Sequence, residues 1–122
     1  AVPKLLIVDD EIDVREFAGN FFRKRGIQVL LASSGAEALR IIAAERPDLV
    51  LLDIRMEEMS GIEVLRKVRS SGDQTRIIMV SGVEDDTIVA EAKSAGVLAF
   101  VHKPLVLEEL QNIVLREIGP HP

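Results

Sequence analysis

The sequence contains no cysteine, tryptophan or tyrosine, and only four of its 122 residues are phenylalanine. Without cysteine, the chain has no thiol nucleophile, no disulfide and no cysteine-ligated metal. Without tryptophan or tyrosine, it lacks the aromatic platform on which single-stranded nucleic acids stack. These absences exclude thiol enzymes, cysteine-ligated zinc proteins and stacking-based single-strand binders as function classes.

The sequence also lacks a concentration of positive charge and any long apolar run. Asp and Glu number 20 against 15 Lys and Arg, so the formal net charge is -5. We expect no direct nucleic-acid binding by this domain, because phosphate recognition requires clustered basic residues. No apolar run approaches the roughly 18 residues of a membrane-spanning helix, and the N-terminus does not resemble a signal peptide. We therefore expect a cytoplasmic protein without a membrane partner.

Hydrophobic residues make up 48% of the chain, which is ordinary for one globular domain of this length. Five short apolar runs alternate with five stretches of helical periodicity, a pattern typical of α/β proteins. Because the runs are continuously apolar, we expect a parallel sheet with helices on both faces. The predicted strands span residues 5–8, 29–32, 49–52, 77–80 and 98–101.

Capping signals set the limits of the helical stretches. Glycine or proline follows four of them, as at helix C-termini, and the Ser-x-x-Glu spacing of a capping box precedes two of them, at Ser34 and Ser60. The predicted helices span residues 11–25, 35–45, 61–70, 85–95 and 107–117. On the first helix we assign Phe17, Phe21 and Phe22 to the core. Residues 1–118 should form the domain, and residues 119–122 a tail or the start of a linker.

Polar residues follow several predicted strands, at the edge where parallel sheets bind ligands. Asp9 and Asp10 follow the first strand, Asp53 the third and Ser81 the fourth, while Lys103 lies just past the fifth. If the first and third strands are neighbours, about 4.8 Å apart, their carboxylates come close together and favour a hard cation such as Mg²⁺. A metal, a lysine and a hydroxyl around Asp53 suit phosphoryl transfer, with Asp53 as the nucleophile that forms an acyl phosphate.

The segments LLIVDDE, LVLLDIRM, MVSG and AFVHKP occur in this order along the chain. They resemble the receiver domain of two-component response regulators, and the likeness covers essentially the whole sequence. The resemblance implies a flavodoxin-like (CheY-like) three-layer sandwich with five helices around a five-stranded parallel sheet of order 2-1-3-4-5. It also implies a switch that accepts a phosphoryl group from the phosphohistidine of a sensor histidine kinase and later removes it by self-hydrolysis.

The resemblance assigns roles at the acidic site. It makes Asp53 the phosphoacceptor, and it makes Asp9 and Asp10 the acids that hold Mg²⁺ together with Asp53 and the backbone carbonyl of Arg55. Lys103 would pair with the phosphoryl group. By this reading the domain is not an enzyme in the ordinary sense, because it catalyses only its own phosphorylation and dephosphorylation.

The resemblance also assigns a switch. Ser81 would contact the phosphoryl group, and Phe100 would be the aromatic residue that turns inward with it. The Lys103–Pro104 bond is a candidate cis peptide. Arg55 and Val83, which stand two residues after the phosphoacceptor and two after the hydroxyl residue, would modulate self-hydrolysis, and their bulk predicts a long phosphorylated lifetime.

Structural roles compete with several of these assignments. Asp10 could simply cap the following helix, Ser81 with Glu84 also has the spacing of a capping box, and Phe100 could be an ordinary core residue. Many receivers carry Pro-Gly four and five residues after the phosphoacceptor, where this chain has Glu57–Glu58. These two acids could help hold Mg²⁺ or repel a phosphoryl donor.

Other functions on the same fold are also considered. A receiver-like interaction module without phosphorylation would be expected to have lost at least one site residue, and none is lost. A phosphohydrolase would need a second acid where Arg55 stands, and Asp9–Asp10–Glu11 would repel a flavin phosphate. Output would run through the last two helices and the last strand, onto a second copy, a separate effector or a domain beyond the C-terminus. The sequence does not identify the kinase, the stimulus or the output.

Overall fold

Five strands alternate with five helices along the chain, as the sequence predicts. The fold is described from a computed structural model, in which residues 2–82 and 84–119 are placed. The strands are β1 (Lys4–Val8), β2 (Gln28–Ala32), β3 (Leu49–Asp53), β4 (Ile77–Ser81) and β5 (Ala99–His102). The helices are α1 (Ile12–Arg23), α2 (Gly35–Glu45), α3 (Gly61–Ser70), α4 (Asp86–Ser94) and α5 (Leu107–Ile118). Each boundary lies within two residues of its predicted position.

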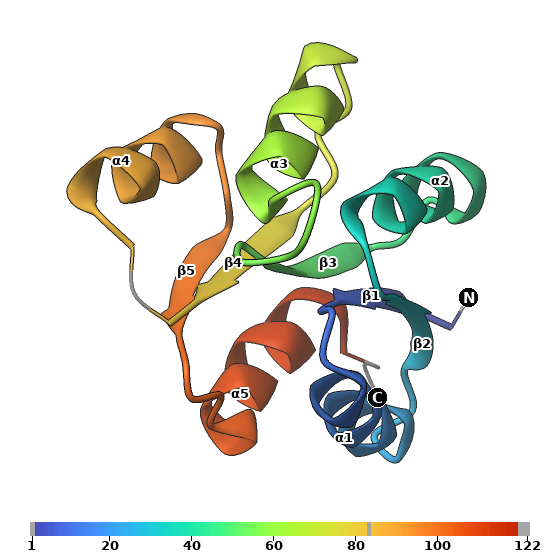
Figure 1. The fold of residues 1–122 in the computed structure, drawn as a ribbon. Helices are drawn as coiled ribbons and strands as arrows, with labels where there is room; N and C mark the ends of the chain where they lie inside the picture. The colour runs from blue at the N-terminus through green and yellow to red at the C-terminus, as the bar shows by residue number, and fades with distance from the viewer. Residues whose placement is uncertain (1, 83, 120–122) are drawn as a thin grey trace.

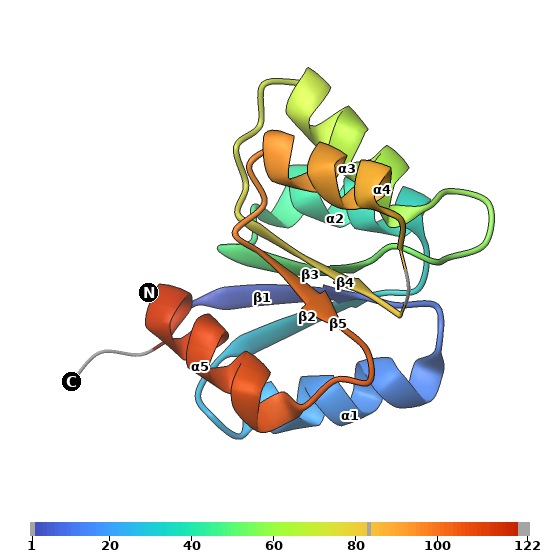
Figure 2. The same cartoon turned by 90° about the vertical axis from the view of Figure 1, so that its left-hand side faces the viewer.

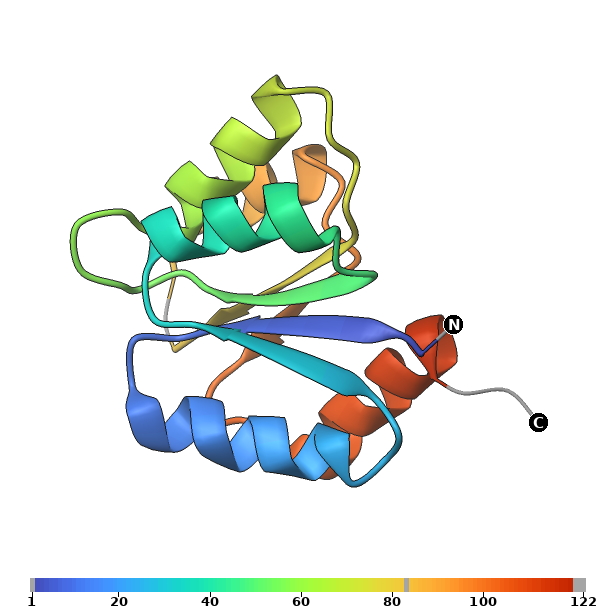
Figure 3. The ribbon, with the colours of Figure 1, turned by 90° about the vertical axis from the view of Figure 1, so that its right-hand side faces the viewer.

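The strands form one parallel sheet of order β2-β1-β3-β4-β5, which confirms the predicted order 2-1-3-4-5. Helices α2, α3 and α4 cover one face of the sheet, and α1 and α5 cover the other (Figures 1 and 2). The connection between β3 and α3 projects past the carboxyl ends of the strands (Figure 3). These ends of the strands carry the candidate site.

The sheet separates two hydrophobic cores. Side chains of successive strand residues point to opposite faces, so Leu6 and Val8 of β1 pack under α2, α3 and α4, whereas Leu5 and Ile7 pack against α1 and α5. Every residue of β3 and β4 is buried, because these strands are central and covered on both faces. Full burial of both faces explains why the strands are continuously apolar.

The prediction that all three phenylalanines of α1 face the core is wrong. Phe22 is fully buried and Phe21 is partly buried, but Phe17 is 69% exposed. The buried residues of α1 are Ala18, Gly19 and Phe22, which form a narrow stripe at i, i+1 and i+4. Phe17 precedes Ala18 by one position, which rotates its side chain by about 100° toward solvent.

The observed helix caps show whether Asp10 and Ser81 have the capping roles considered above. Ser34 and Ser60 accept hydrogen bonds from the backbone N–H groups three residues later, so both predicted N-caps are confirmed. The N-cap of α4 is Asp85, which accepts from the N–H of Ile88, so Ser81 does not cap this helix. The N-cap of α1 is Glu11, so Asp10 does not occupy that position either. Among the residues placed in the structure, no helix is long and apolar enough to cross a membrane.

Candidate functional site

The register of the sheet brings two buried acids side by side. Val8 of β1 pairs with Leu52 of β3, so the next residue of each strand, Asp9 and Asp53, lies at the same edge. Both are only 3% exposed, whereas the neighbouring Asp10 is exposed. One carboxylate oxygen from each of these three residues lies within 4.8 Å of the others. The structure therefore brings together the three acids that the sequence singles out.

The main chain at Asp53 is held by the start of α3. The N–H of Gly61 donates to the carbonyl of Ile54 at 2.9 Å. A Cβ atom at position 61 would lie 2.2 Å from the carbonyl oxygen of Asp53, a distance that atoms cannot tolerate. Glycine is required here because the backbone of α3 approaches the phosphoacceptor candidate so closely.

Asp9 is held in place by hydrogen bonds to the start of α1 and to the end of β2. Its Oδ1 accepts from the N–H of Glu11 at 2.9 Å, and its backbone carbonyl accepts from Nη1 of Arg15 at 2.7 Å. Its own N–H donates to the carbonyl of Ala32 at 3.1 Å. The carboxylate is thus positioned before any ligand arrives.

Lys103 reaches the two buried acids from the end of β5. Its Nζ lies 3.3 Å from Oδ2 of Asp9 and 3.3 Å from Oδ2 of Asp53. Its N–H donates to the carbonyl of Ser81 at 2.7 Å, which ties the end of β5 to the end of β4. The peptide bond between Lys103 and Pro104 is cis.

Burial and neighbouring charge shift the protonation equilibria of the site. Burial and, to a smaller extent, the negative charge of Asp9 raise the pKa of Asp53 from 3.8 to about 6, although Lys103 partly opposes this shift. Burial alone would lower the pKa of Lys103, but Asp53 and Asp9 together outweigh burial and raise this pKa. One ammonium group thus offsets the charge of two buried carboxylates.

The donor set at this edge fits a divalent cation. Within residues 2–82 and 84–119, Oδ1 of Asp53 is a buried side-chain oxygen with no hydrogen-bond partner. Such an orphaned carboxylate oxygen is costly unless a ligand satisfies it. Three carboxylates at close range form the all-oxygen environment that Mg²⁺ prefers. The residues present therefore fit the metal that the sequence predicts.

Ser81 is fully buried at the end of β4, one residue beyond Val80, which pairs with Asp53. Its hydroxyl donates to Oε1 of Glu84 at 2.9 Å. The same Oε1 accepts from Nε of Arg55 at 2.9 Å. The sequence predicts Glu84 only as a capping residue, so this network is not predicted, although the Ser-x-x-Glu spacing is the signal that could reveal it.

Phe100, the predicted switch residue, lies on β5 opposite Met79 of β4. It is partly buried and packs against the core under α2, α3 and α4. Its ring lies 5.5 Å from that of His102, tilted by 52°. Val83, the second predicted modulator of hydrolysis, lies outside the described residues, as do residues 120–122 of the predicted tail.

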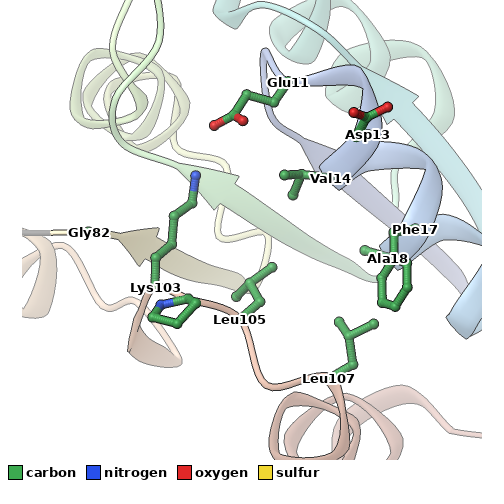
Figure 4. Close-up of a pocket in the computed structure, with 10 residues that line it drawn as sticks. Glu11, Asp13, Val14, Phe17, Ala18, Gly82, Lys103, Leu105 and Leu107 are labelled. Atoms are coloured by element: carbon green, nitrogen blue, oxygen red, sulfur yellow. The ribbon is translucent and has the colours of Figure 1, made fainter.

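A largely apolar hollow of about 750 Å³ opens beside Lys103. Figure 4 shows Val14, Phe17 and Ala18 on α1 facing Leu105 and Leu107, the latter at the start of α5, with Lys103 along one side. Asp53 does not line this hollow. The hollow therefore adjoins the acidic cluster but is not the cluster itself.

The parallel sheet of order 2-1-3-4-5, with acids at the carboxyl ends of β1 and β3, defines a CheY-like α/β domain. The sequence model of the response regulator receiver domain matches residues 5–115, and the chain belongs to this family. It is accordingly a regulatory receiver domain of two-component signalling.

Individual relatives agree with this assignment. The chain is 36% identical over 111 residues to sporulation initiation phosphotransferase F of Bacillus subtilis (strain 168), covering 91% of this chain and 90% of that protein. It is 38% identical to the regulatory protein AtoC of Escherichia coli (strain K12), covering 97% of this chain but only 26% of AtoC. A response regulator receiver protein from Pseudomonas putida superposes with a TM-score of 0.91 at 33% identity, covering 96% of this chain and 98% of that one.

Proposed function

We propose that the chain is a phosphorylation-activated switch in which Asp53 accepts a phosphoryl group from the phosphohistidine of a sensor histidine kinase. The observation that carries the proposal is the buried Asp53 carboxylate, which has an orphaned oxygen, a second acid beside it and Lys103 at 3.3 Å. A structural aspartate in a core would have its oxygens satisfied. An acceptor needs a free oxygen next to positive charge.

In the proposed reaction, a carboxylate oxygen of Asp53 attacks the phosphorus atom as the bond from phosphorus to the histidine nitrogen breaks. The product is an acyl phosphate on Asp53, and the histidine leaves with the electron pair of the broken bond. Lys103 keeps Asp53 ionised for attack and offsets the negative charge of the arriving group. Water later attacks the phosphorus, the bond from phosphorus to the Asp53 oxygen breaks, and inorganic phosphate leaves as the carboxylate is restored.

The proposal includes a resident Mg²⁺. Asp9, Asp10, Asp53 and the backbone carbonyl of Arg55 would hold it. When bound, Mg²⁺ neutralises charge on the transferred phosphoryl oxygens. Asp9 suits this role because its hydrogen bond from Glu11 fixes its carboxylate. Asp10 suits it because its exposed side chain lies where an ion from solvent would arrive.

We further propose that Ser81 and Phe100 carry the signal outward. Ser81 would move to the phosphoryl oxygens, and Phe100 would turn inward, shifting a pre-existing equilibrium of the surface formed by α4, β5 and α5. That surface would bind a second copy, a separate effector or an output domain. The chain spans only about a quarter of AtoC and about half of several other response regulators that it resembles, so an output domain is proposed by analogy with such longer relatives.

The donor protein would approach over α1. The hollow beside Lys103 and the exposed Phe17 provide apolar surface next to the phosphoacceptor. A helix that carries the phosphohistidine could cover this surface and deliver the phosphoryl group to Asp53. We also propose that the reaction takes place in the cytoplasm and that this domain contacts neither nucleic acid nor membrane.

Self-hydrolysis of the acyl phosphate would be slowed by bulky side chains. Arg55 and Val83 are the proposed modulators of this step. The side chain of Arg55 is 72% exposed and is paired with Glu84, so it stands at the solvent side of the site. We expect Arg55→Ala to shorten the phosphorylated lifetime, measured as the decay of the phosphorylated protein.

Intact-mass spectrometry after treatment with acetyl phosphate and Mg²⁺ tests the proposed function. We expect one phosphoryl adduct on the wild-type chain, its absence from Asp53→Asn and its loss when EDTA is added. Asp86→Asn, which changes an exposed aspartate of α4, should still form the adduct. Absence of an adduct from acetyl phosphate and from a panel of histidine kinases would favour an interaction module without phosphorylation.

A further inference from the structure

The only proton of the Ser81 hydroxyl is already engaged in this structure. A serine hydroxyl has one O–H donor, and that of Ser81 points to Oε1 of Glu84 at 2.9 Å. Ser81 therefore cannot donate to a second acceptor while this bond persists. In the proposed function, however, Ser81 must contact a phosphoryl group on Asp53.

Glu84 is held in place for this contact. Its side chain is only 6% exposed, and its Oε1 also accepts from Nε of Arg55 at 2.9 Å. Hydrogen bonds to an ionised carboxylate are stronger than those between neutral groups. The shielded Glu84 carboxylate is thus a strong acceptor, and a phosphoryl group must compete with it for the Ser81 hydroxyl.

We propose that Glu84 is a positioning residue that holds the Ser81 hydroxyl in the unphosphorylated chain, so that transfer of this hydrogen bond from Glu84 to the phosphoryl group is a step of activation. The inference rests on the proposed function at Asp53. It adds a residue whose carboxylate opposes activation and so sets the population of the active state.

The position of Glu84 gives this exchange a route to the proposed output surface. Glu84 immediately precedes Asp85, whose side chain caps α4 by accepting from the N–H of Ile88 at 2.9 Å. When Ser81 leaves Glu84, the carboxylate keeps Arg55 but loses its contact with the end of β4. The segment that leads into α4 is then held to the sheet by one fewer hydrogen bond.

Binding of beryllofluoride, an unreactive mimic of the phosphoryl group, tests the proposal in the presence of Mg²⁺. We expect Glu84→Ala to bind it about tenfold more tightly than wild type, since one hydrogen bond to a charged group no longer competes. Glu84→Gln keeps a weaker, neutral acceptor and should show a smaller gain. Asp86→Ala removes the same charge from the exposed start of α4 and should bind like wild type.

Glu84→Ala also removes a negative charge near the site, and Ser81→Ala separates this effect from the loss of the hydrogen bond. In the Ser81→Ala background, adding Glu84→Ala should no longer give the full gain, because no hydroxyl remains to be released. An equal gain with and without Ser81, or equal gains from Glu84→Ala and Glu84→Gln, would show that charge alone acts and would overturn the proposal.

The fold of each variant is checked by circular dichroism and thermal unfolding. If the wild type binds beryllofluoride and Glu84→Ala, with its fold intact, binds no more tightly, the positioning role is wrong while the proposed function stands. If the wild type binds neither beryllofluoride nor a phosphoryl group, the proposed function fails, and the role of Glu84 fails with it.

Discussion

The Nζ atom of Lys103 lies 3.3 Å from Oδ2 of Asp53 and at the same distance from Oδ2 of Asp9. One ammonium group is thus shared by two buried carboxylates. Sharing leaves the negative charge of Asp53 incompletely offset, and burial raises the pKa of this residue to about 6. Ionisation of Asp53 in the folded chain is therefore less favourable than ionisation of an ordinary exposed aspartate.

This raised pKa predicts how the free energy of unfolding depends on pH. The folded chain holds the Asp53 proton more tightly than the unfolded chain, whose aspartate has an ordinary pKa of 3.8. The contribution of Asp53 to the free energy of unfolding therefore falls as pH rises from about 4 to about 6, and it is constant above that range. At pH 7.5, without Mg²⁺, we expect Asp53→Asn to be more stable than wild type by about 1–3 kcal/mol.

Urea unfolding in EDTA at several pH values measures this difference. The advantage of Asp53→Asn should shrink as pH falls through 6 and nearly vanish near pH 4, as the folded wild type takes up its proton. Asp86→Asn, at an exposed position, serves as the control and should show no such trend. A constant difference across the range would contradict the raised pKa.

Mg²⁺ should stabilise the wild type through the three clustered acids. A ligand that binds only the folded chain stabilises it by about 1.4 kcal/mol for each tenfold excess over its dissociation constant. We expect the melting temperature to rise with Mg²⁺ and not with K⁺ at matched ionic strength. Asp10→Asn gives the clearest test of this effect. Because Asp10 is exposed, the substitution should change the free energy of unfolding in EDTA by no more than about 0.5 kcal/mol.

The comparison of Asp10→Asn with Asp13→Asn isolates the metal contribution. Both remove one exposed carboxylate near the start of α1, but only Asp10 belongs to the cluster. Asp13→Asn should retain the full response to Mg²⁺, whereas Asp10→Asn should lose most of it. Equal responses in the two variants would place the ion elsewhere.

Two phenylalanines of α1 should differ sharply in their contribution to stability. Phe22 is fully buried, whereas Phe17 is 69% exposed. We expect Phe22→Ala to lower the free energy of unfolding by about 3–5 kcal/mol and Phe17→Ala to change it by no more than about 0.5 kcal/mol. Chemical denaturation of the two variants checks this, and comparable losses would mean that Phe17 is in the core.

The exposed Phe17 also shows what the sequence could not decide. Buried strands, glycine helix ends and Ser-x-x-Glu caps are local signals, and they predict all ten elements to within two residues of their ends. Which face of α1 is buried depends instead on how the helix sits on the sheet. The pattern of three phenylalanines suggests a broad apolar face, but small residues, Ala18 and Gly19, form part of the actual contact.

The candidate site is predictable for a related reason. Acids at the ends of two parallel strands must meet if those strands are neighbours, and the register of Val8 with Leu52 makes Asp9 and Asp53 neighbours. The contact between Ser81 and Glu84 depends on side-chain rotamers in a loop. Periodicity carries no information about rotamers, so the same Ser-x-x-Glu spacing that marks caps at Ser34 and Ser60 marks a different hydrogen bond here.

Glu58 offers a test of backbone strain in the loop beside the site. Its φ of 65° lies in the left-handed region, which costs a residue with a Cβ atom about 1–2 kcal/mol relative to glycine. Replacing it by glycine also adds about 0.5–1 kcal/mol of unfolded-state entropy. We expect Glu58→Gly to raise the free energy of unfolding by a net amount of about 0.5 kcal/mol.

Glu57→Gly is the matched control, because it removes the same charge one residue earlier at a position that does not have a positive φ. Without strain to relieve, it should lower stability by about 0.5–1 kcal/mol. The two variants should thus differ by about 1–1.5 kcal/mol in urea unfolding at one pH and ionic strength. Equal effects would mean that the carboxylates alone matter and that the loop stores no strain at Glu58.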